Sequence, residues 1–132
     1  ENDDRDNLFL GLEDNGIGTI VFSPLAQGLL TDKYLSGNIP ENCRARENKF
    51  LSESDINEKM VKKLNALNDI AASRGQSLTQ MALTWILSKQ NITSVIVGAR
   101  NREQLSKSLS ALKTKRDFSA AEDKKIIEIA SL

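Results

Sequence analysis

Residues 16–28 read GIGTIVFSPLAQG, and the apolar run at 17–22 returns at 93–97 as TSVIV. Both runs are rich in β-branched residues and lack the alternation of a strand with one wet face, which is typical of parallel strands covered on both faces. Pro24 ends the first run because proline cannot donate a ladder hydrogen bond, and Gly98 ends the second. The sequence therefore predicts two short parallel strands, at 17–22 and 93–97.

Helical segments flank both predicted strands. They are expected at 3–15, from Asp55 to Gly75, from Ser77 onward, at 101–112, and from Ser119 toward the C-terminus. Ser77 and Ser119 each begin a capping-box pattern with a Gln or Glu three residues later, which marks a helix start. The last helix is expected to bury Ile126, Ile127 and either Ile129 or Ala130. Residues 36–52 are polar and are predicted to form a long loop.

Alternating helices and strands favour an α/β fold with a parallel sheet. Two parallel strands do not make a stable sheet, and helices cannot cover a two-stranded ribbon without leaving its edges open. We therefore expect residues 1–132 to be a single partial domain, incomplete on its own. The rest of the fold, or another chain, would have to complete it.

Composition narrows the function classes. Eighteen Lys and Arg balance eighteen Asp and Glu, so the chain has no net charge to attract nucleic acid or an anionic membrane. No apolar run approaches the roughly 20 residues of a membrane span, and the acidic N-terminal stretch lacks the basic region of a signal peptide. Cys43 is the single cysteine, which suits a reducing compartment, so we expect a cytoplasmic protein.

The chain contains no histidine. This excludes Ser-His-Asp and Cys-His catalysis and histidine-based zinc sites within the chain. One cysteine also excludes an internal disulfide and a multi-cysteine metal site. No metal ligands and no catalytic residues are predicted.

Two segments are candidates for chemistry because each follows a predicted strand, where ligands gather in parallel α/β folds. The first, 22–28, is also readable as a simple turn, since Pro and Gly commonly end strands. The second, 97–104, places Arg100 and Arg102 where a helix begins. The helix dipole disfavours cations there, so either a phosphate bridges them or they are solvated beside Glu103.

Lys33 and Tyr34 together could form an acid/base pair, in which the lysine lowers the tyrosine pKa. Sequence neighbours need not meet in space, so packing of Tyr34 with Lys33 in solvent or facing a phosphate is the favoured interpretation. Cys43 lies beside Arg44 but has no partner thiol or histidine, and is interpreted as an incidental loop cysteine.

The segments GIGTIVFSPLAQGLLTDKYL, NIPENCR, RGQSLTQMALTWIL and TSVIVGARNREQL occur in this order from Gly16 toward the end of the chain. Together they resemble the aldo-keto reductases, most closely bacterial enzymes similar to the β subunits of voltage-gated potassium channels. That family has a TIM (β/α)8 barrel. The resemblance implies that this α/β chain is the C-terminal part of the barrel, from the helix after strand six through strands seven and eight and the final helices.

The resemblance also implies NADP(H) as the cofactor and a small aldehyde or ketone as the substrate. Residues matching the family's cofactor-contacting positions on the nicotinamide and pyrophosphate side are Phe22, Ser23, Pro24, Leu25, Gln27 and Gly28, with Phe22 facing the nicotinamide ring. Lys33 matches a lysine that approaches the phosphates, and Arg44 an arginine near the adenosine end. Positions in the adenosine-phosphate pocket are matched by Gly98, Ala99, Arg100 and Gln104.

The chain departs from the family pattern at two adenine-contacting positions. Lys107 and Ser108 stand where the family often has Glu and Asn. Ser108 remains a candidate cofactor contact, but the changes leave open the adenine affinity and the preference for NADP over NAD.

The family's catalytic Asp, Tyr, Lys and His lie on earlier strands, and Tyr34 falls in the cofactor loop. We therefore expect the chain to be the cofactor-binding portion of an NADP-dependent aldehyde or ketone reductase, inactive in isolation. The alternative is a non-catalytic nucleotide-binding or interaction module resembling a channel β subunit.

Overall fold

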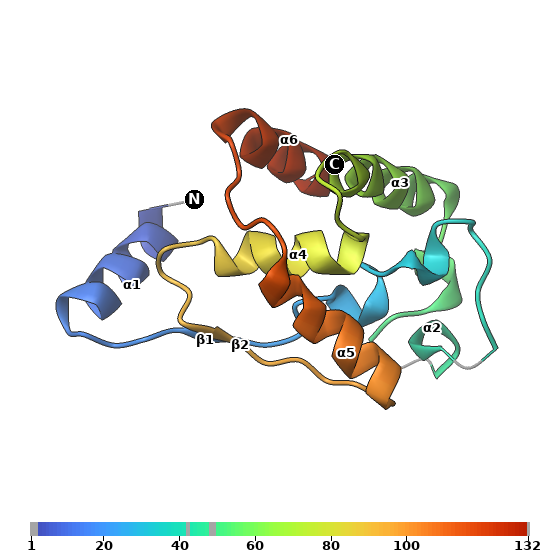
Figure 1. Ribbon diagram of the computed structural model, residues 1–132, viewed down its shortest axis with the longest axis horizontal. Helices are drawn as coiled ribbons and strands as arrows, with labels where there is room; N and C mark the ends of the chain where they lie inside the picture. Colours follow the sequence, from blue (N-terminus) through green and yellow to red (C-terminus); the bar gives the residue numbers. More distant parts are fainter. Residues whose placement is uncertain (1–2, 42, 48–49, 132) are drawn as a thin grey trace.

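The computed structural model describes residues 3–41, 43–47 and 50–131. Its helices and strands are α1 (Asp3–Asp14), β1 (Ile20–Val21), α2 (Arg44–Glu47), α3 (Glu58–Ser73), α4 (Leu78–Leu87), β2 (Ser94–Val95), α5 (Arg102–Ser110) and α6 (Ala120–Ser131). Short 3-10 turns lie at η1 (Ala26–Gly28), η2 (Asp32–Tyr34), η3 (Glu53–Asp55) and η4 (Ala111–Lys113). Helices α3 and α6 lie side by side, α4 runs through the middle, and the strands and α5 form the opposite side (Figure 1).

The two predicted strands pair in parallel, with Ile20 opposite Ser94 and Val21 opposite Val95. The two backbone segments lie close together just before the paired residues, at Gly18 and Thr93. A Cβ on Gly18 would lie 2.7 Å from the Thr93 hydroxyl, so only glycine fits there. That hydroxyl accepts a hydrogen bond from the Thr19 amide at 3.1 Å. The expected parallel topology is confirmed.

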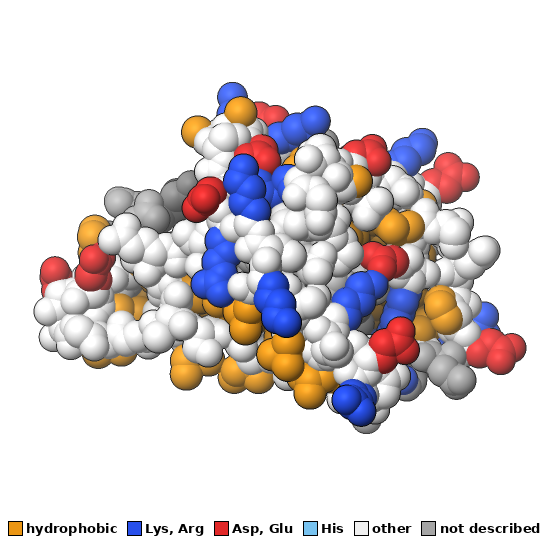
Figure 2. All heavy atoms as spheres, viewed as in Figure 1, with side chains coloured by type: hydrophobic (Ala, Val, Ile, Leu, Met, Phe, Trp, Pro, Cys, Tyr) orange, Lys and Arg blue, Asp and Glu red, His pale blue; other side chains and the backbone are white. Residues whose placement is uncertain are grey.

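The strands are shorter than predicted, at two residues each instead of 17–22 and 93–97. Each strand has one neighbouring strand in the described chain, and only its two central residues pair with that neighbour in a ladder of hydrogen bonds. In the described chain the strands are not covered on both faces, because Ile20 is 63% and Ile96 is 59% exposed. Hydrophobic side chains gather along the edge that carries β1, β2 and α5 (Figure 2). Apolar surface of this kind is expected of a piece of a larger α/β fold.

Helix ends follow the predicted capping signals. The Ser77 side chain accepts from the Gln80 amide at 3.3 Å, and the Ser119 side chain accepts from the Glu122 amide at 3.2 Å. Helix α3 begins later than expected, after Asn57, whose side chain accepts from the Met60 amide at 3.0 Å. None of the helices described has the length and apolar run that a membrane crossing requires.

The core lies among α3, α4 and α6, where Leu64, Leu78 and Ile126 are buried. Ile127 was expected to be buried as well and is 47% exposed, because it lies one position round the helix from Ile126.

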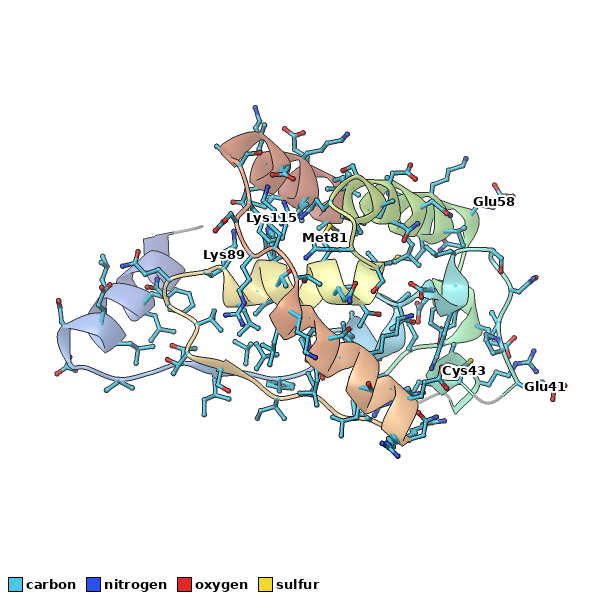
Figure 3. The ribbon with its side chains drawn as sticks, viewed as in Figure 1. Glu41, Cys43, Glu58, Met81, Lys89 and Lys115 are labelled. Carbon is cyan, nitrogen blue, oxygen red and sulfur yellow. The ribbon has the colours of Figure 1, made fainter. Side chains whose placement is uncertain are left out.

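The described residues of the long loop predicted at 36–52 contain more regular structure than expected. It contains α2, and it contributes the buried residues Cys43, Ala45 and Leu51 to the core. Figure 3 labels two residues of this loop, with Glu41 projecting from the edge of the molecule and Cys43 lying further in. These three apolar side chains therefore hold the described part of the loop against the body of the fold.

Candidate functional site

Parallel pairing makes β1 and β2 end at the same edge of the sheet, so the segments that follow them leave side by side. Between these segments lies a cleft of about 800 Å³. Segment 22–28 forms one wall, and segment 96–108, which includes the start of α5, forms the other. A cleft of this size is in the range of small-molecule and cofactor sites.

The structure brings all of the predicted cofactor-contacting residues to this one cleft. Its lining includes Phe22, Ser23, Pro24, Leu25, Gln27, Gly28, Lys33, Arg44, Gly98, Ala99, Arg100, Gln104 and Ser108. Residues far apart in the sequence therefore converge as the resemblance implies. Their contact with a cofactor stays a prediction.

Four further lining residues were missed by the sequence interpretation: Thr31, Asp32, Thr79 and Ile96. Thr79 lies in the first turn of α4 and is 3% exposed, and its hydroxyl donates to the Leu30 carbonyl at 3.4 Å. Nothing local in the sequence marks Thr79, because the contact spans 49 positions. Asp32 could have been noticed as an acidic residue beside Lys33.

Backbone strain is concentrated in the first wall. Ser23, Ala26 and Gln27 have φ values of 52°, 46° and 60°, and they are the non-glycine residues with positive φ among those described. Such conformations cost energy, persist only where the surroundings enforce them, and cluster at ligand-binding sites. Segment 22–28 is thus both the predicted strand-ending turn and a cleft wall. It leaves Phe22 80% exposed.

The second wall is organised by side-chain caps at the start of α5. The Asn101 side chain accepts from the Gln104 amide at 2.9 Å, and the Gln104 side chain accepts from the Arg100 amide at 3.0 Å. These two bonds fix the turn between β2 and α5. Ser108, one of the adenine-contacting candidates, is 8% exposed in the second turn of the helix.

Basic side chains outnumber acidic ones in the cleft lining. The basic residues are Lys33, Arg44, Arg100 and Lys107, and the acidic ones are Asp32 and Glu103. Lys107 forms an ion pair with Asp32, which joins α5 to η2 across the cleft. The Arg44 guanidinium donates a hydrogen bond to the Gln27 side-chain carbonyl. The excess positive charge favours an anionic ligand.

Lys33 and Tyr34 lie in different surroundings. Lys33 lines the cleft, whereas Tyr34 is 1% exposed in the core. Burial, and then the hydrogen bond with the Cys43 thiol, together raise the pKa of Tyr34 to about 12. The packing interpretation of Tyr34 is therefore favoured over the acid/base pair, since a phenol with a raised pKa is a poor proton donor near neutrality.

Parallel strands, covering helices and an anion-favouring cleft at the carboxyl ends of the strands define an α/β protein with a ligand-sized cleft where such folds place their sites. A family model described as "Aldo/keto reductase family" matches residues 1–130, so the chain belongs to the aldo/keto reductase family. The family fold is the TIM barrel. The two parallel strands and helices of this chain are part of such a barrel.

Curated relatives of two kinds are similar to this chain. An L-glyceraldehyde 3-phosphate reductase from Escherichia coli O157:H7 is 47% identical over 118 residues, covering 83% of this chain and 32% of that protein. A probable voltage-gated potassium channel subunit beta from Oryza sativa subsp. japonica is 42% identical over 99 residues, covering 74% of this chain and 30% of that protein. A protein of the same description from Arabidopsis thaliana is 40% identical over 107 residues. The chain thus spans about a third of the length of these relatives.

Proposed function

We propose that this chain is the C-terminal, cofactor-binding segment of an NADP-dependent oxidoreductase that reduces aldehydes or ketones. One observation carries the proposal: residues from 22 to 108 that match the family's cofactor positions line a single cleft with excess positive charge. The similarity to an L-glyceraldehyde 3-phosphate reductase supports a small carbonyl compound as the substrate. In the barrel, α1 would follow strand six, and β1 and β2 would be strands seven and eight.

The residues present fit a phosphorylated dinucleotide. Lys33, Arg44 and Arg100 would bind its phosphates, because guanidinium and ammonium groups make charge-assisted bonds to phosphate oxygens. Phe22, 80% exposed at the cleft, would pack against the nicotinamide ring. The bound cofactor supplies the hydride for reduction of a carbonyl carbon.

The proton for the carbonyl oxygen has to come from elsewhere. The chain has no histidine, and its one tyrosine, Tyr34, is buried with a raised pKa. The remainder of the barrel would supply this group and the other walls of the substrate pocket. We therefore expect the 132-residue chain alone to have no reductase activity, and the whole protein to act in the cytoplasm.

A second candidate function is favoured by the plant relatives described as channel β subunits. In that case the same cleft would bind the nucleotide without turnover, and the protein would act as an interaction module. The two candidates share the cofactor cleft and differ in chemistry outside this chain.

The test uses the full-length protein and titrates NADPH by its fluorescence. Lys33→Met should weaken NADPH binding about fivefold, because one charge-assisted contact is lost. Lys59→Met, the same change on the exposed face of α3, should leave binding unchanged. Oxidation of NADPH on addition of an aldehyde supports the reductase, and binding without oxidation of NADPH by any aldehyde supports the second candidate. Failure to bind NADPH would overturn both.

A further inference from the structure

Gln27 connects the end of the first strand to Arg44. Its side-chain amide Nε2 donates to the Ser23 Oγ at 3.3 Å, and its Oε1 accepts from the Arg44 Nη1. A primary amide has donors at one end and an acceptor at the other, so these two contacts together select one orientation of the group. Gln27 has a φ of 60°, which the turn at Ala26–Gly28 maintains.

The backbone on both sides of Arg44 is fixed by burial. Cys43 is 2% exposed and Ala45 is 0% exposed, and both belong to the same core cluster as Tyr34. Arg44 itself is exposed and lines the cleft. The long loop therefore has its backbone held in the core at this point, while the guanidinium is the part left to be positioned from the cleft side.

Gln27 is a neutral partner for this arginine. In the described part of the chain, no carboxylate lies within ion-pair distance of the Arg44 guanidinium, in contrast to Lys107, which pairs with Asp32. A carboxylate at position 27 would hold the guanidinium and also cancel its charge. An amide holds it and leaves the positive charge available to an anion.

We propose that Gln27 is a positioning residue that holds the Arg44 guanidinium at the cleft for an anionic group of the cofactor. The inference rests on the proposed function and assigns Gln27 an action through Arg44. A free arginine side chain loses much rotamer freedom when it binds a ligand, and holding it in place beforehand reduces this entropy cost. Removing the amide should therefore weaken binding only when Arg44 is present.

A double-mutant cycle in the full-length protein tests this dependence. The variants are Gln27→Met, Arg44→Met and the pair together, each titrated with NADPH. We expect Arg44→Met to raise the dissociation constant about tenfold and Gln27→Met about fourfold, since the first loses a charged contact and the second a positioning hydrogen bond. In the Arg44→Met background, Gln27→Met should change the constant by less than about twofold.

Gln90→Met is the matched control. Gln90 is exposed beyond the end of α4, where it borders a small cavity formed with α1, away from the cleft. This variant should change neither binding nor melting temperature. The ligand-free melting temperature of Gln27→Met should also stay within about 2 °C of the unmodified protein, because a single exposed hydrogen bond contributes little to folding.

Two outcomes would overturn the inference. If Gln27→Met raised the dissociation constant equally with Arg44 present and with Arg44→Met, Gln27 would be a direct ligand. If Gln27→Met left the constant unchanged while Arg44→Met raised it, Gln27 would not position the arginine. Inorganic pyrophosphate serves as a second probe in the same cycle. Coupling with pyrophosphate but no binding of NADPH would keep the role of Gln27 and overturn the proposed function. Absence of coupling with both probes would overturn the inference.

Discussion

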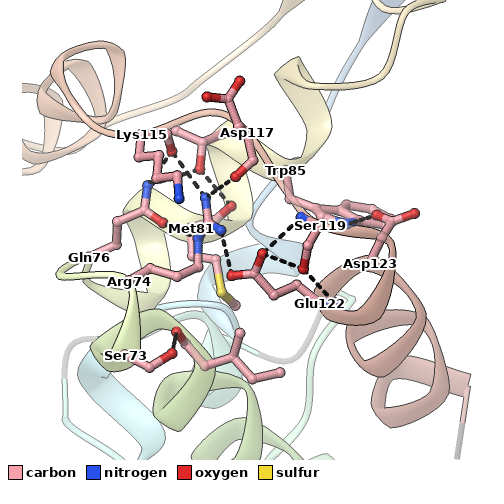
Figure 4. Close-up of polar contacts among 12 residues, drawn as sticks. Ser73, Arg74, Gln76, Met81, Trp85, Lys115, Asp117, Ser119, Glu122 and Asp123 are labelled. Carbon is pink, nitrogen blue, oxygen red and sulfur yellow. Dashed lines mark hydrogen bonds and ion pairs between the residues drawn. The ribbon is translucent and has the colours of Figure 1, made fainter.

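Arg74 and Arg44 carry the same guanidinium in opposite surroundings. The Arg74 side chain is 3% exposed, and it donates to Gln76 Oε1 at 2.8 Å and to Glu122 Oε1 at 2.7 Å (Figure 4). It also donates to the carbonyls of Asp117 and Lys115, at 2.9 and 3.3 Å. Arg44 is exposed, and among the described residues its side chain has one partner, the neutral amide of Gln27. The hydrogen-bonding capacity still available separates an arginine that stabilises the fold from one that can bind a ligand.

Replacing both arginines by Met should produce the largest contrast. Arg74→Met should lower the free energy of unfolding of the full-length protein by about 3 kcal/mol, because Glu122 Oε1, Gln76 Oε1 and the Asp117 carbonyl lose the guanidinium that donates to them. It also removes the guanidinium that lies 3.7 Å from the centre of the Phe118 ring. Arg44→Met should change that free energy by less than about 0.5 kcal/mol. Urea denaturation measures the unfolding free energy of both variants. Equal decreases would show that Arg74 does not stabilise the fold more than Arg44 does.

Conservative replacements should sharpen the contrast. Lysine has three donors on one atom and cannot reproduce the fork of bonds that Arg74 makes to Gln76, Glu122 and the carbonyls. Arg74→Lys should therefore still cost about 2 kcal/mol of unfolding free energy. Arg44→Lys keeps the charge at the cleft and should weaken NADPH binding by less than about threefold. A large loss of binding in Arg44→Lys would mean that the cofactor needs the guanidinium geometry.

The environment of Arg74 should also produce a pH dependence. The Ser119 amide, then the Arg74 guanidinium and the Ser119 hydroxyl, lower the pKa of Glu122 from 4.5 to about 2. A carboxylate with a lowered folded-state pKa stabilises the fold above its unfolded-state value, near 4.5, and this contribution is lost as the pH falls toward about 2. Because Glu122 is 31% exposed, solvent screens it, and we expect about 1 to 2 kcal/mol at neutral pH.

Comparing Glu122→Gln with the unmodified protein isolates this contribution. The difference in unfolding free energy between the two should be largest at neutral pH and should shrink as the pH falls below about 4.5. Glu128→Gln, an exposed change on the same helix, should show a small difference at every pH. A constant difference for Glu122→Gln would show that its carboxylate has an ordinary pKa.

The sequence predicted well those features that depend on residues close together in the chain. The Ser77 and Ser119 caps were predictable because their partners lie three residues away, and the parallel strands were recognisable from their β-branched runs. The cleft residues were predicted through the family resemblance, which carries information that no single segment holds. Their convergence depends on β1 and β2 ending at the same edge.

Long-range pairings were not predictable. Arg74 and Glu122 are 48 positions apart, and each resembles an ordinary surface residue at a helix end. The burial of Cys43 and Ala45 was missed because their polar neighbours give the loop a solvated character. The strand lengths were overestimated because a strand needs partners on both sides, and the described chain provides one for each.

The smallest expected effect concerns the ion pair that joins the walls of the cleft. Lys107 and Asp32 have side chains 44% and 46% exposed, so their pair contributes at most about 0.5 kcal/mol to folding. Asp32→Asn removes a negative charge from the cleft and frees Lys107, so NADPH should bind about twofold more tightly at low salt. The gain should disappear near 1 M salt, where the screening length falls to about 3 Å. Asp69→Asn, the same change on the exposed face of α3, is the control and should leave NADPH binding unchanged. Weaker binding by Asp32→Asn would mean instead that Asp32 holds Lys107 in place for the ligand, as Gln27 is proposed to hold Arg44.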